Sequence, residues 1–227
     1  MIFKEERIAS KEKLSASPLL DGYVSNAAYL VLQYIDFDNH HDWKVFGKAL
    51  AQMHRISSTK FGFGADNFIG SSIQKNTQKD NWLDFWRQCR LGFQLELAYE
   101  NGWEAELRKP GSELLERLPE FFESYRPQPS LLHGDLWSGN CASRHGVPYI
   151  FDPACYYGDR ETDVAMTELF GGFSGEFYEA YNEVWPLDSA YEKRRVLYNL
   201  YHILNHLNIF GDIYLSQAQS MLRRLLN

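Results

Sequence analysis

The chain has 227 residues, of which 44% are hydrophobic and 15% aromatic, enough to bury the core of one domain or of two small ones. Its 23 basic and 30 acidic residues give a formal net charge of -7, which argues against a protein whose main ligand is the phosphate backbone of a nucleic acid. No apolar run has membrane-spanning length and the first residues are charged, so we expect neither a membrane partner nor a secretory signal, and predict a cytoplasmic protein.

The first predicted elements are a strand and a helix. Residues 29–35 form a short aliphatic and aromatic run that predicts a strand. Apolar residues then recur at helical spacing behind Asp42, a residue type that caps helices, and predict a helix that ends near Arg55. Residues 57–80 are rich in Gly, Ser, Asn and Gln, which predicts a long ordered loop of the kind that usually serves a site.

The rest of the chain is predicted to be mainly helical. Apolar periodicity predicts helices over residues 82–93, 114–125, 196–207 and around 221–225, and a short strand over 147–151.

The cysteines and histidines show no metal-binding pattern. Cys89, Cys141 and Cys155 are odd in number and lack C-x-x-C spacing, so we expect buried free thiols. His202 and His206 share one helical face, but no third ligand is near in sequence, which favours a packed, partly polar helix over a metal site.

A phosphoryl-transfer pattern lies in His133-Gly134-Asp135-Leu136-Trp137-Ser138-Gly139-Asn140, where Asp135 precedes Asn140 by five residues. A carboxylate can accept the proton of an attacking hydroxyl, and a carboxamide oxygen is a hard ligand suited to Mg²⁺. Asp152 follows the predicted strand over 147–151, 17 residues after Asp135, and supplies a charged ligand for the metal that bridges nucleotide phosphates.

This spacing matches the protein-kinase pattern H-R-D-x-x-x-x-N followed by a metal-binding aspartate. Two alternatives remain open. Asp135 could simply cap a turn, and the pair Asp135 and Asp152 also fits glycoside hydrolysis or an aspartic dyad, although those hypotheses give Asn140 no role. In a kinase-like fold, the backbone of Tyr34-Ile35-Asp36 is placed to hydrogen-bond an adenine edge.

Several segments resemble the fructosamine kinase family, and the resemblance covers about residues 29–227. It implies an α+β, protein kinase-like fold of the aminoglycoside phosphotransferase type, mainly the helical large C-terminal lobe. Residues 1–35 are then a remnant of the N-terminal lobe with the hinge strand, and residues 36–227 the helical lobe. The segments that carry it are 66–70 with Gln74 and Asn76, 90–95, 130–140, 151–154, 156–163, 169–173 and 200–211.

The resemblance also implies an activity. Such a kinase uses Mg-ATP to phosphorylate the sugar 3-hydroxyl of a small-molecule or protein-bound ketosamine (fructosamine), a step in the removal of glycation adducts. Carried over by motif, Asp135 is the expected proton acceptor, Asn140 and Asp152 the magnesium ligands, and Tyr34-Ile35-Asp36 the adenine-binding hinge. Trp137 is expected to form an apolar or stacking wall for the sugar or its amine, with a core tryptophan as the alternative.

Two features next to these motifs complete the predictions. Asp159, Glu161 and Asp163 are expected to order their loop with Arg160 through charge-assisted hydrogen bonds, with an electronegative patch for a cationic amine as the alternative. His133 is expected to be a structural brace.

The family's smaller lobe normally carries a glycine-containing phosphate loop and a lysine that contacts the phosphates. Neither is recognisable in the 28 residues before the predicted strand, and residues 1–17 predict a charged helix. Two alternatives to a ketosamine kinase therefore stay open: a catalytically impaired, truncated pseudokinase or binding remnant, and a related kinase for another amino alcohol or aminoglycoside. The oligomeric state is not predicted.

Overall fold

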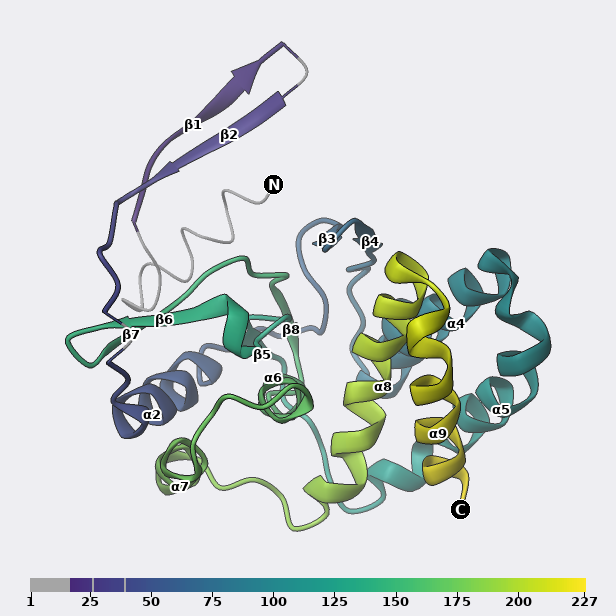
Figure 1. Cartoon of the computed structure of the whole chain (residues 1–227). Helices are drawn as coiled ribbons and strands as arrows, with labels where there is room; N and C mark the ends of the chain where they lie inside the picture. The colour runs from purple at the N-terminus through teal and green to yellow at the C-terminus, as the bar shows by residue number, and fades with distance from the viewer. Residues whose placement is uncertain (1–16, 26, 39) are drawn as a thin grey trace.

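The computed structural model describes residues 17–25, 27–38 and 40–227, so the charged helix predicted over residues 1–17 lies outside the described residues except for its last position. Figure 1 shows a mainly helical body from which one two-stranded hairpin projects. This arrangement agrees with the predicted α+β class.

The projecting hairpin pairs β1 (Pro18–Val24) antiparallel with β2 (Ala27–Leu32). The strand predicted over residues 29–35 is therefore shifted, since β2 begins two residues earlier and ends three residues earlier. Beyond Leu32 the chain leaves the hairpin, and Ile35 is buried, with 8% of its surface exposed. Residues 33–38, here called the connector, link the hairpin to the body (Figure 1).

The helix α2 (Trp43–His54) begins and ends where the sequence predicts. Oδ1 of Asp42 accepts a backbone N–H of its first turn at 3.0 Å and so caps the helix. The helix packs against α7 (Gly175–Val184). Gly47 permits this close approach, since a Cβ atom there would lie 2.2 Å from the carbonyl oxygen of Phe177.

The loop predicted over residues 57–80 contains a small hairpin of β3 (Asn67–Ile69) and β4 (Ser72–Gln74). Each strand has only three residues, too few for alternation to mark it in the sequence. Gly70 forms the turn with φ of +58°, and a Cβ atom there would lie 3.1 Å from the Ile209 side chain. The hairpin turn therefore lies directly against the end of the helix α8 (Tyr191–Phe210).

One long, bent helical segment follows. Of the two helices predicted here, the one over 82–93 is confirmed and extends further, whereas the one over 114–125 begins at Glu104 and ends as a 3₁₀ turn. The first part of the helix that begins at Glu104 is mostly exposed and polar, so no apolar stripe marks it in the sequence. The parts of the bent segment are α3 (Trp82–Phe85), a π-helical turn (Trp86–Leu91), α4 (Gly92–Ala98), a second π-helical turn (Tyr99–Trp103), α5 (Glu104–Arg117) and the 3₁₀ turn (Leu118–Phe122).

Two short antiparallel pairs of strands then carry the loops that hold Asp135 and Asp152. The strand predicted over 147–151 is confirmed as β7, and its partner is the preceding strand. The pairs are β5 (Ser130–Leu132) with β8 (Tyr156–Gly158) and β6 (Cys141–Arg144) with β7 (Val147–Ile150).

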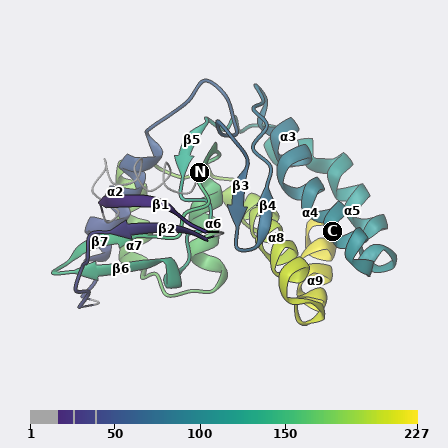
Figure 2. The ribbon, with the colours of Figure 1, turned by 90° about the horizontal axis from the view of Figure 1, so that it is seen from above.

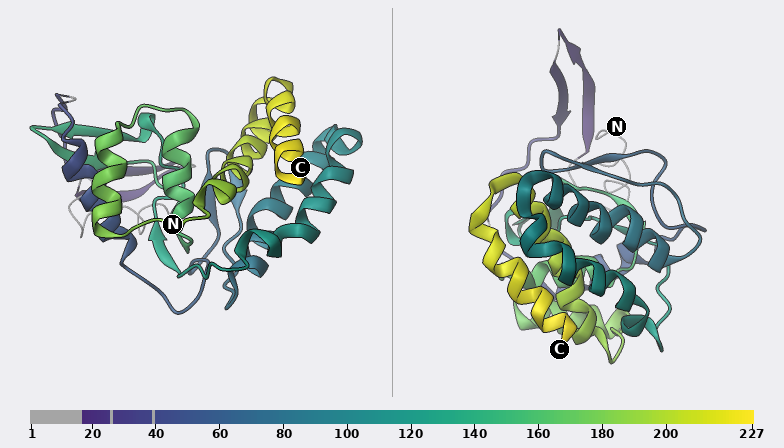
Figure 3. Two further views of the ribbon diagram at one scale, coloured as in Figure 1. Left: turned by 90° about the horizontal axis from the view of Figure 1, so that it is seen from below. Right: turned by 90° about the vertical axis from the view of Figure 1, so that its right-hand side faces the viewer.

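The remaining helices connect the two halves of the body. Figures 2 and 3 show α8 between a group formed by α2, α6 and α7 and a group formed by α4, α5 and α9. The helices predicted over 196–207 and around 221–225 lie within α8 and α9. Side chains from both groups join one hydrophobic core, which runs from Phe46 to Leu225. The bounds are α6 (Glu161–Leu169), α8 (Tyr191–Phe210) and α9 (Leu215–Leu226).

Two further predictions can be compared with the structure. Cys89, Cys141 and Cys155 are buried and free, as predicted. No helix in the described part of the chain combines the length and apolar character that a membrane crossing requires.

Candidate active site

The loop that follows β5 is held in place by a glycine. Gly134 has φ of +84°, and a Cβ atom at this position would lie 2.1 Å from the carbonyl oxygen of Ala154. The backbone N–H of Ala154 donates to the carbonyl oxygen of His133 at 2.8 Å. The residue before the predicted base is therefore a glycine because no larger side chain fits between the two chain segments.

Asp163, in the first turn of α6, anchors the loop that follows β5. Its Oδ2 accepts the backbone N–H of His133 at 2.7 Å, and its Oδ1 accepts that of Gly134 at 2.9 Å. Burial alone would raise the pKa of the Asp163 carboxyl, but the hydrogen bond and charge interaction with His54, whose Nε2 lies 3.1 Å away, outweigh burial and lower it. The ionised carboxylate thus satisfies two backbone donors in the interior.

His133 braces the loop against the strand that delivers Asp152. Its Nδ1 accepts the backbone N–H of Asp135 at 3.2 Å, so in this neutral tautomer Nε2 carries the proton and donates to the carbonyl oxygen of Phe151 at 2.9 Å. Burial lowers the pKa of His133, which keeps the ring neutral. This is the structural role expected for His133.

Asn140 and Asp152 lie at the same end of the β6–β7 hairpin. The pairing of Cys141 with Ile150 places Asn140 opposite Phe151, whose backbone N–H donates to the Asn140 carbonyl oxygen at 3.1 Å. Asp152 is the next residue, exposed and with φ of +54°, a left-handed conformation that is uncommon for a residue with a side chain. The hairpin register, rather than proximity in sequence, brings these two residues to the same end of the hairpin.

Asn140 also contacts the predicted base directly. Its Nδ2 donates to the backbone carbonyl oxygen of Asp135 at 2.9 Å and to Oδ2 of the same residue at 3.3 Å. This orientation fixes the carboxamide and turns its Oδ1 away from Asp135.

The donor atoms here fit a magnesium ion. Within the described residues, no group of three or more His, Cys, Asp and Glu side chains is placed to hold a metal. One carboxamide oxygen from Asn140 and one carboxylate from Asp152 are nevertheless the hard oxygen donors that Mg²⁺ prefers, because this ion keeps several waters and takes phosphate oxygens as its other ligands.

The side chain of Asp135 is 22% exposed. Burial, with a smaller contribution from the negative charge of Asp163, raises the pKa of Asp135 to about 7, whereas the hydrogen bond from Asn140 opposes the rise. On its other side, Nδ1 of His202 lies 4.0 Å from Oδ1 of Asp135 and has no hydrogen-bond partner in the described chain. Burial lowers the pKa of His202 to about 3, so the ring beside Asp135 is neutral.

A cavity of about 430 Å³ opens beside Asp135. The Trp137 side chain is 37% exposed and lines this cavity, so the alternative of a core tryptophan is wrong. Its ring folds over Gly139, where a Cβ atom would lie 2.2 Å from the ring. The lining residues are Ile69, Gly70, Asp135, Trp137, Met166, Phe170, Asn205, His206, Ile209, Phe210 and Tyr214.

A second cavity, of about 480 Å³, lies between residues 80–83 and 119–127. It is slightly larger, but it contains none of the predicted site residues. The cavity beside Asp135 is therefore the candidate substrate site.

The predicted hinge residues Tyr34, Ile35 and Asp36 lie in the connector. Their backbone N–H and C=O groups make no backbone hydrogen bond within the described residues, whereas the flanking Gln33 and Asp38 do. Asp38 donates its N–H to the carbonyl oxygen of Ser143 in β6 at 3.1 Å. The connector is thus fixed against β6 by Asp38, next to the predicted hinge residues.

Phe37 is a residue that the sequence analysis missed. Its ring centroid lies 6.2 Å from that of Phe151, the residue before Asp152, and 5.7 Å from that of Tyr149. This contact links the connector to the strand that delivers Asp152.

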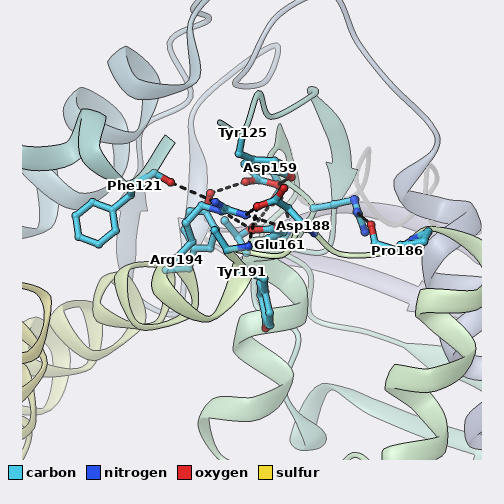
Figure 4. Close-up of polar contacts among 12 residues, drawn as sticks. Phe121, Tyr125, Asp159, Glu161, Pro186, Asp188, Tyr191 and Arg194 are labelled. Carbon is cyan, nitrogen blue, oxygen red and sulfur yellow. Dashed lines mark hydrogen bonds and ion pairs between the residues drawn. The ribbon is translucent and has the colours of Figure 1, made fainter. Parts of the chain in front are cut away.

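The acidic residues that follow β8 are buried. Figure 4 shows Asp159 and Glu161 gathered around Arg194 of α8. Nε of Arg194 lies 2.7 Å from Oε2 of Glu161, and the Tyr125 hydroxyl donates to Oδ1 of Asp159 at 2.9 Å. Asp159, Glu161 and Asp163 each have 1% exposure or less, so the alternative of an electronegative surface patch is wrong.

The predicted pairing of these acids with Arg160 is also wrong. The Arg160 guanidinium donates to the Tyr181 hydroxyl at 3.0 Å and to the Trp185 carbonyl oxygen at 2.9 Å, and its Cζ atom lies 4.2 Å from the centroid of the Trp185 ring. The acids do order this part of the chain, but Glu161 pairs with Arg194, 33 residues further on, and Asp163 contacts His54.

Residues 8–227 match the family model described as fructosamine kinase. The chain belongs to the fructosamine kinase family. It is 45% identical over 213 residues to the "Probable ketoamine kinase" of Vibrio cholerae, which covers 92% of this chain and 73% of that protein. It is 43% identical over 202 residues to the chloroplastic protein-ribulosamine 3-kinase of Arabidopsis thaliana, covering 87% of this chain and 62% of that protein.

Solved structures agree with this assignment. A protein from Haemophilus somnus assigned as a fructosamine-3-kinase superposes with a TM-score of 0.88 at 28% identity, over all of this chain and 80% of that one. The aminoglycoside phosphotransferase APH(4)-Ia superposes with a TM-score of 0.62 at 14% identity, over 99% of this chain and 81% of that one, a likeness of fold alone. The predicted protein kinase-like fold of the aminoglycoside phosphotransferase type is confirmed, and this fructosamine kinase family member is a kinase.

Proposed function

We propose that this family member transfers the γ-phosphoryl group of ATP to the sugar 3-hydroxyl of ketosamines, free or attached to protein. Family membership and the names of the relatives, ketoamine kinase and protein-ribulosamine 3-kinase, support the substrate class. One structural observation carries the proposal: Asp135, whose carboxyl has a pKa of about 7, borders a cavity and is hydrogen-bonded by Asn140. A non-catalytic remnant gives no role to this arrangement.

In the proposed reaction, the 3-hydroxyl lies within hydrogen-bonding distance of the Asp135 carboxylate. The carboxylate accepts the hydroxyl proton while the oxygen bonds to the γ-phosphorus, and ADP leaves with the electron pair of the broken P–O bond. A base is most effective when its pKa is close to the working pH, and the raised pKa of Asp135 satisfies this condition. The proton then passes to solvent through the exposed edge of the carboxylate.

We assign Asn140 and Asp152 as the residues that hold Mg²⁺. When bound, the ion neutralises charge on the nucleotide phosphates and orients them. Nδ2 of Asn140 is engaged by Asp135, which leaves Oδ1 of the same carboxamide for the ion. His133 keeps the two parts of this site together through its contacts to Asp135 and Phe151.

We assign Tyr34, Ile35 and Asp36 as the adenine-binding segment. Their backbone groups make no backbone hydrogen bond within the described residues, and the flanking Asp38 holds the segment against β6. In this proposal residues 1–35 are a remnant of the N-terminal lobe with the hinge strand, and residues 36–227 form the helical lobe. Trp137, folded over Gly139 at the edge of the cavity, provides a flat apolar wall for the substrate.

The substrate class is tested by measuring ATP-dependent phosphorylation of fructoselysine, ribuloselysine, ethanolamine and an aminoglycoside by the same preparation. The proposal predicts phosphate transfer only to the two ketosamines, with the phosphorus located on the 3-oxygen by phosphorus and proton NMR. Transfer to ethanolamine or to the aminoglycoside, with none to the ketosamines, would establish the related kinase instead.

A further inference from the structure

The cavity beside Asp135 continues into a row of aromatic rings. Ring centroids lie 6.2 Å apart for Trp137 and Phe170, 5.4 Å for Phe170 and His206, and 5.6 Å for His206 and Phe210. Tyr214 completes the row, 5.0 Å from His206. We call Phe170, His206, Phe210 and Tyr214 the aromatic subsite.

The aromatic subsite is open to solvent. The Phe210 side chain is 58% exposed and that of Phe170 is 44% exposed, although both are large and apolar. The end of α6, the end of α8 and the β3–β4 turn meet at this place, as the contact of Gly70 with Ile209 shows. Exposed apolar groups gathered along a cavity are typical of a ligand surface.

The side chains around this cavity favour a cationic ligand over an anionic one. Among the described residues that line it, Asp135 is the one carboxylate, and none is a Lys or Arg. Nδ1 of His206 lies 2.7 Å from the carbonyl oxygen of His202, so Nδ1 carries a proton and donates, and in the neutral ring Nε2 is an acceptor. Aromatic faces attract cations as well. The described part of the cavity wall thus offers acceptors and ring faces, and no lysine or arginine to pair with a carboxylate.

The geometry of a ketosamine relates this surface to the reaction. The amine sits on carbon 1 and the accepting hydroxyl on carbon 3, so when that hydroxyl reaches Asp135 the amine and its substituent must extend away from the base. Trp137 is two residues beyond Asp135 and begins the aromatic row. The secondary ammonium group of a ketosamine is a cation.

Resting on the proposed function, we propose that the aromatic subsite binds the amine substituent of the ketosamine and selects substituents that are apolar or aromatic over those that carry a carboxylate close to the nitrogen. The enzyme then acts preferentially on adducts of amines with a hydrophobic side chain. Adducts of the α-amino group of small amino acids are poor ligands, because none of the described lining residues is a lysine or arginine that could pair with their carboxylate.

Binding is measured first, by calorimetry without nucleotide, so that the result does not depend on turnover. The ligands are the fructose adducts of benzylamine and of glycine. The variant is Phe210→Ala, and the matched control is Phe68→Ala. Phe68 is 53% exposed and lies in β3, where the side chains alternate, so that it points away from the cavity that its neighbour Ile69 lines.

We expect the benzylamine adduct to bind at least about tenfold more tightly than the glycine adduct, since each tenfold requires only one well-placed apolar contact. Phe210→Ala should weaken the benzylamine adduct by about tenfold and leave the glycine adduct within about twofold, while Phe68→Ala changes neither. Equal affinity of the two adducts, or equal weakening of both by Phe210→Ala, would overturn the proposed subsite.

ADP release then separates this inference from the proposed function. Turnover of both adducts with equal affinity means that the kinase assignment holds and the subsite is wrong. Tight, Phe210-dependent binding of the benzylamine adduct without turnover of either adduct means that the subsite holds and the proposed phosphoryl transfer to ketosamines is wrong.

Discussion

Oδ1 of Asp163 accepts the backbone N–H of Gly134 at 2.9 Å, which ties the first turn of α6 to the loop of the proposed base. The contact is made by a fully buried carboxylate whose second oxygen serves His133. The position of Asp135 therefore depends on a side chain 28 residues further along the chain.

Asp163→Asn should destabilise the protein by about 2–4 kcal/mol, because the amide presents an N–H group to a backbone donor and leaves it unsatisfied. Folding lowers the pKa of Asp163, so in the wild type its contribution is present above the unfolded pKa and is lost as the pH falls through the folded pKa. Urea unfolding at several pH values should therefore give the variant a lower free energy of unfolding than the wild type at pH 7, and this difference should shrink in strong acid. A deficit that is the same at all pH values would contradict this origin.

Activity should fall on the acid side as Asp135 becomes protonated. The raised pKa of Asp135 predicts an acid limb of kcat/KM near pH 7. The charged and titratable groups facing Asp135 are Asp163 from α6, Asp152 after β7 and His202 from α8. Asn140→Ala should move this limb to higher pH, because the hydrogen bond from Asn140 lowers the pKa of Asp135. An unchanged limb in that variant would show that another group titrates.

Ionisation of Asp135 also lowers the stability of the fold. Folding raises the pKa of Asp135 from about 4 in the unfolded chain, so its ionisation destabilises the fold progressively from about pH 4 to pH 7 and fully above that. Allowing for its partial exposure, Asp135→Asn should increase the free energy of unfolding by about 1–3 kcal/mol at pH 8 and by nothing at pH 4. Denaturant titration at the two pH values measures this difference. A loss of stability at pH 8 would contradict the raised pKa.

Gly134→Ala should disrupt the loop. The positive φ and the carbonyl oxygen of Ala154, 2.1 Å from the new Cβ atom, leave no room for a side chain. We expect a loss of about 2–4 kcal/mol, which lowers Tm by about 5–15 °C, together with loss of activity. Gly64→Ala is the matched control, since nothing lies within 4 Å of a Cβ atom there. Equal Tm values for the two variants would refute the steric argument.

Asp152→Asn should raise the Mg²⁺ concentration required for half-maximal activity by about tenfold or more, because a charged oxygen ligand is replaced by a neutral one. Binding of a ketosamine without nucleotide should not change. Magnesium titration of ADP release, with calorimetry as the control, tests the assignment. An unaltered magnesium requirement would remove Asp152 from the metal site.

Local signals in the sequence were sufficient for several elements. Asp42 caps α2 as predicted, and the apolar run before Asp152 is β7, because each depends on neighbouring residues only. The helix α6 was missed because its first turn buries Glu161, Thr162 and Asp163, so the apolar stripe that marks most helices is absent.

Long-range pairs had no local signal. Glu161 meets Arg194 and Asp163 meets His54 across 33 and 109 residues, and only packing of the helices brings them together. For the same reason the sequence assigned the wrong cation, Arg160, to the acids. The spacing of Asp135 and Asn140 was readable because both lie in one loop.

The central claim is that Asp135 is the base of a ketosamine kinase. The most direct test measures ADP release from Mg-ATP with fructoselysine as the acceptor, comparing the 227-residue chain with its Asp135→Asn variant. We expect ketosamine-dependent turnover in the wild type and a decrease of about 10²–10⁴-fold in the folded variant. A variant that retains the wild-type rate, or a folded wild type without turnover, would contradict the claim.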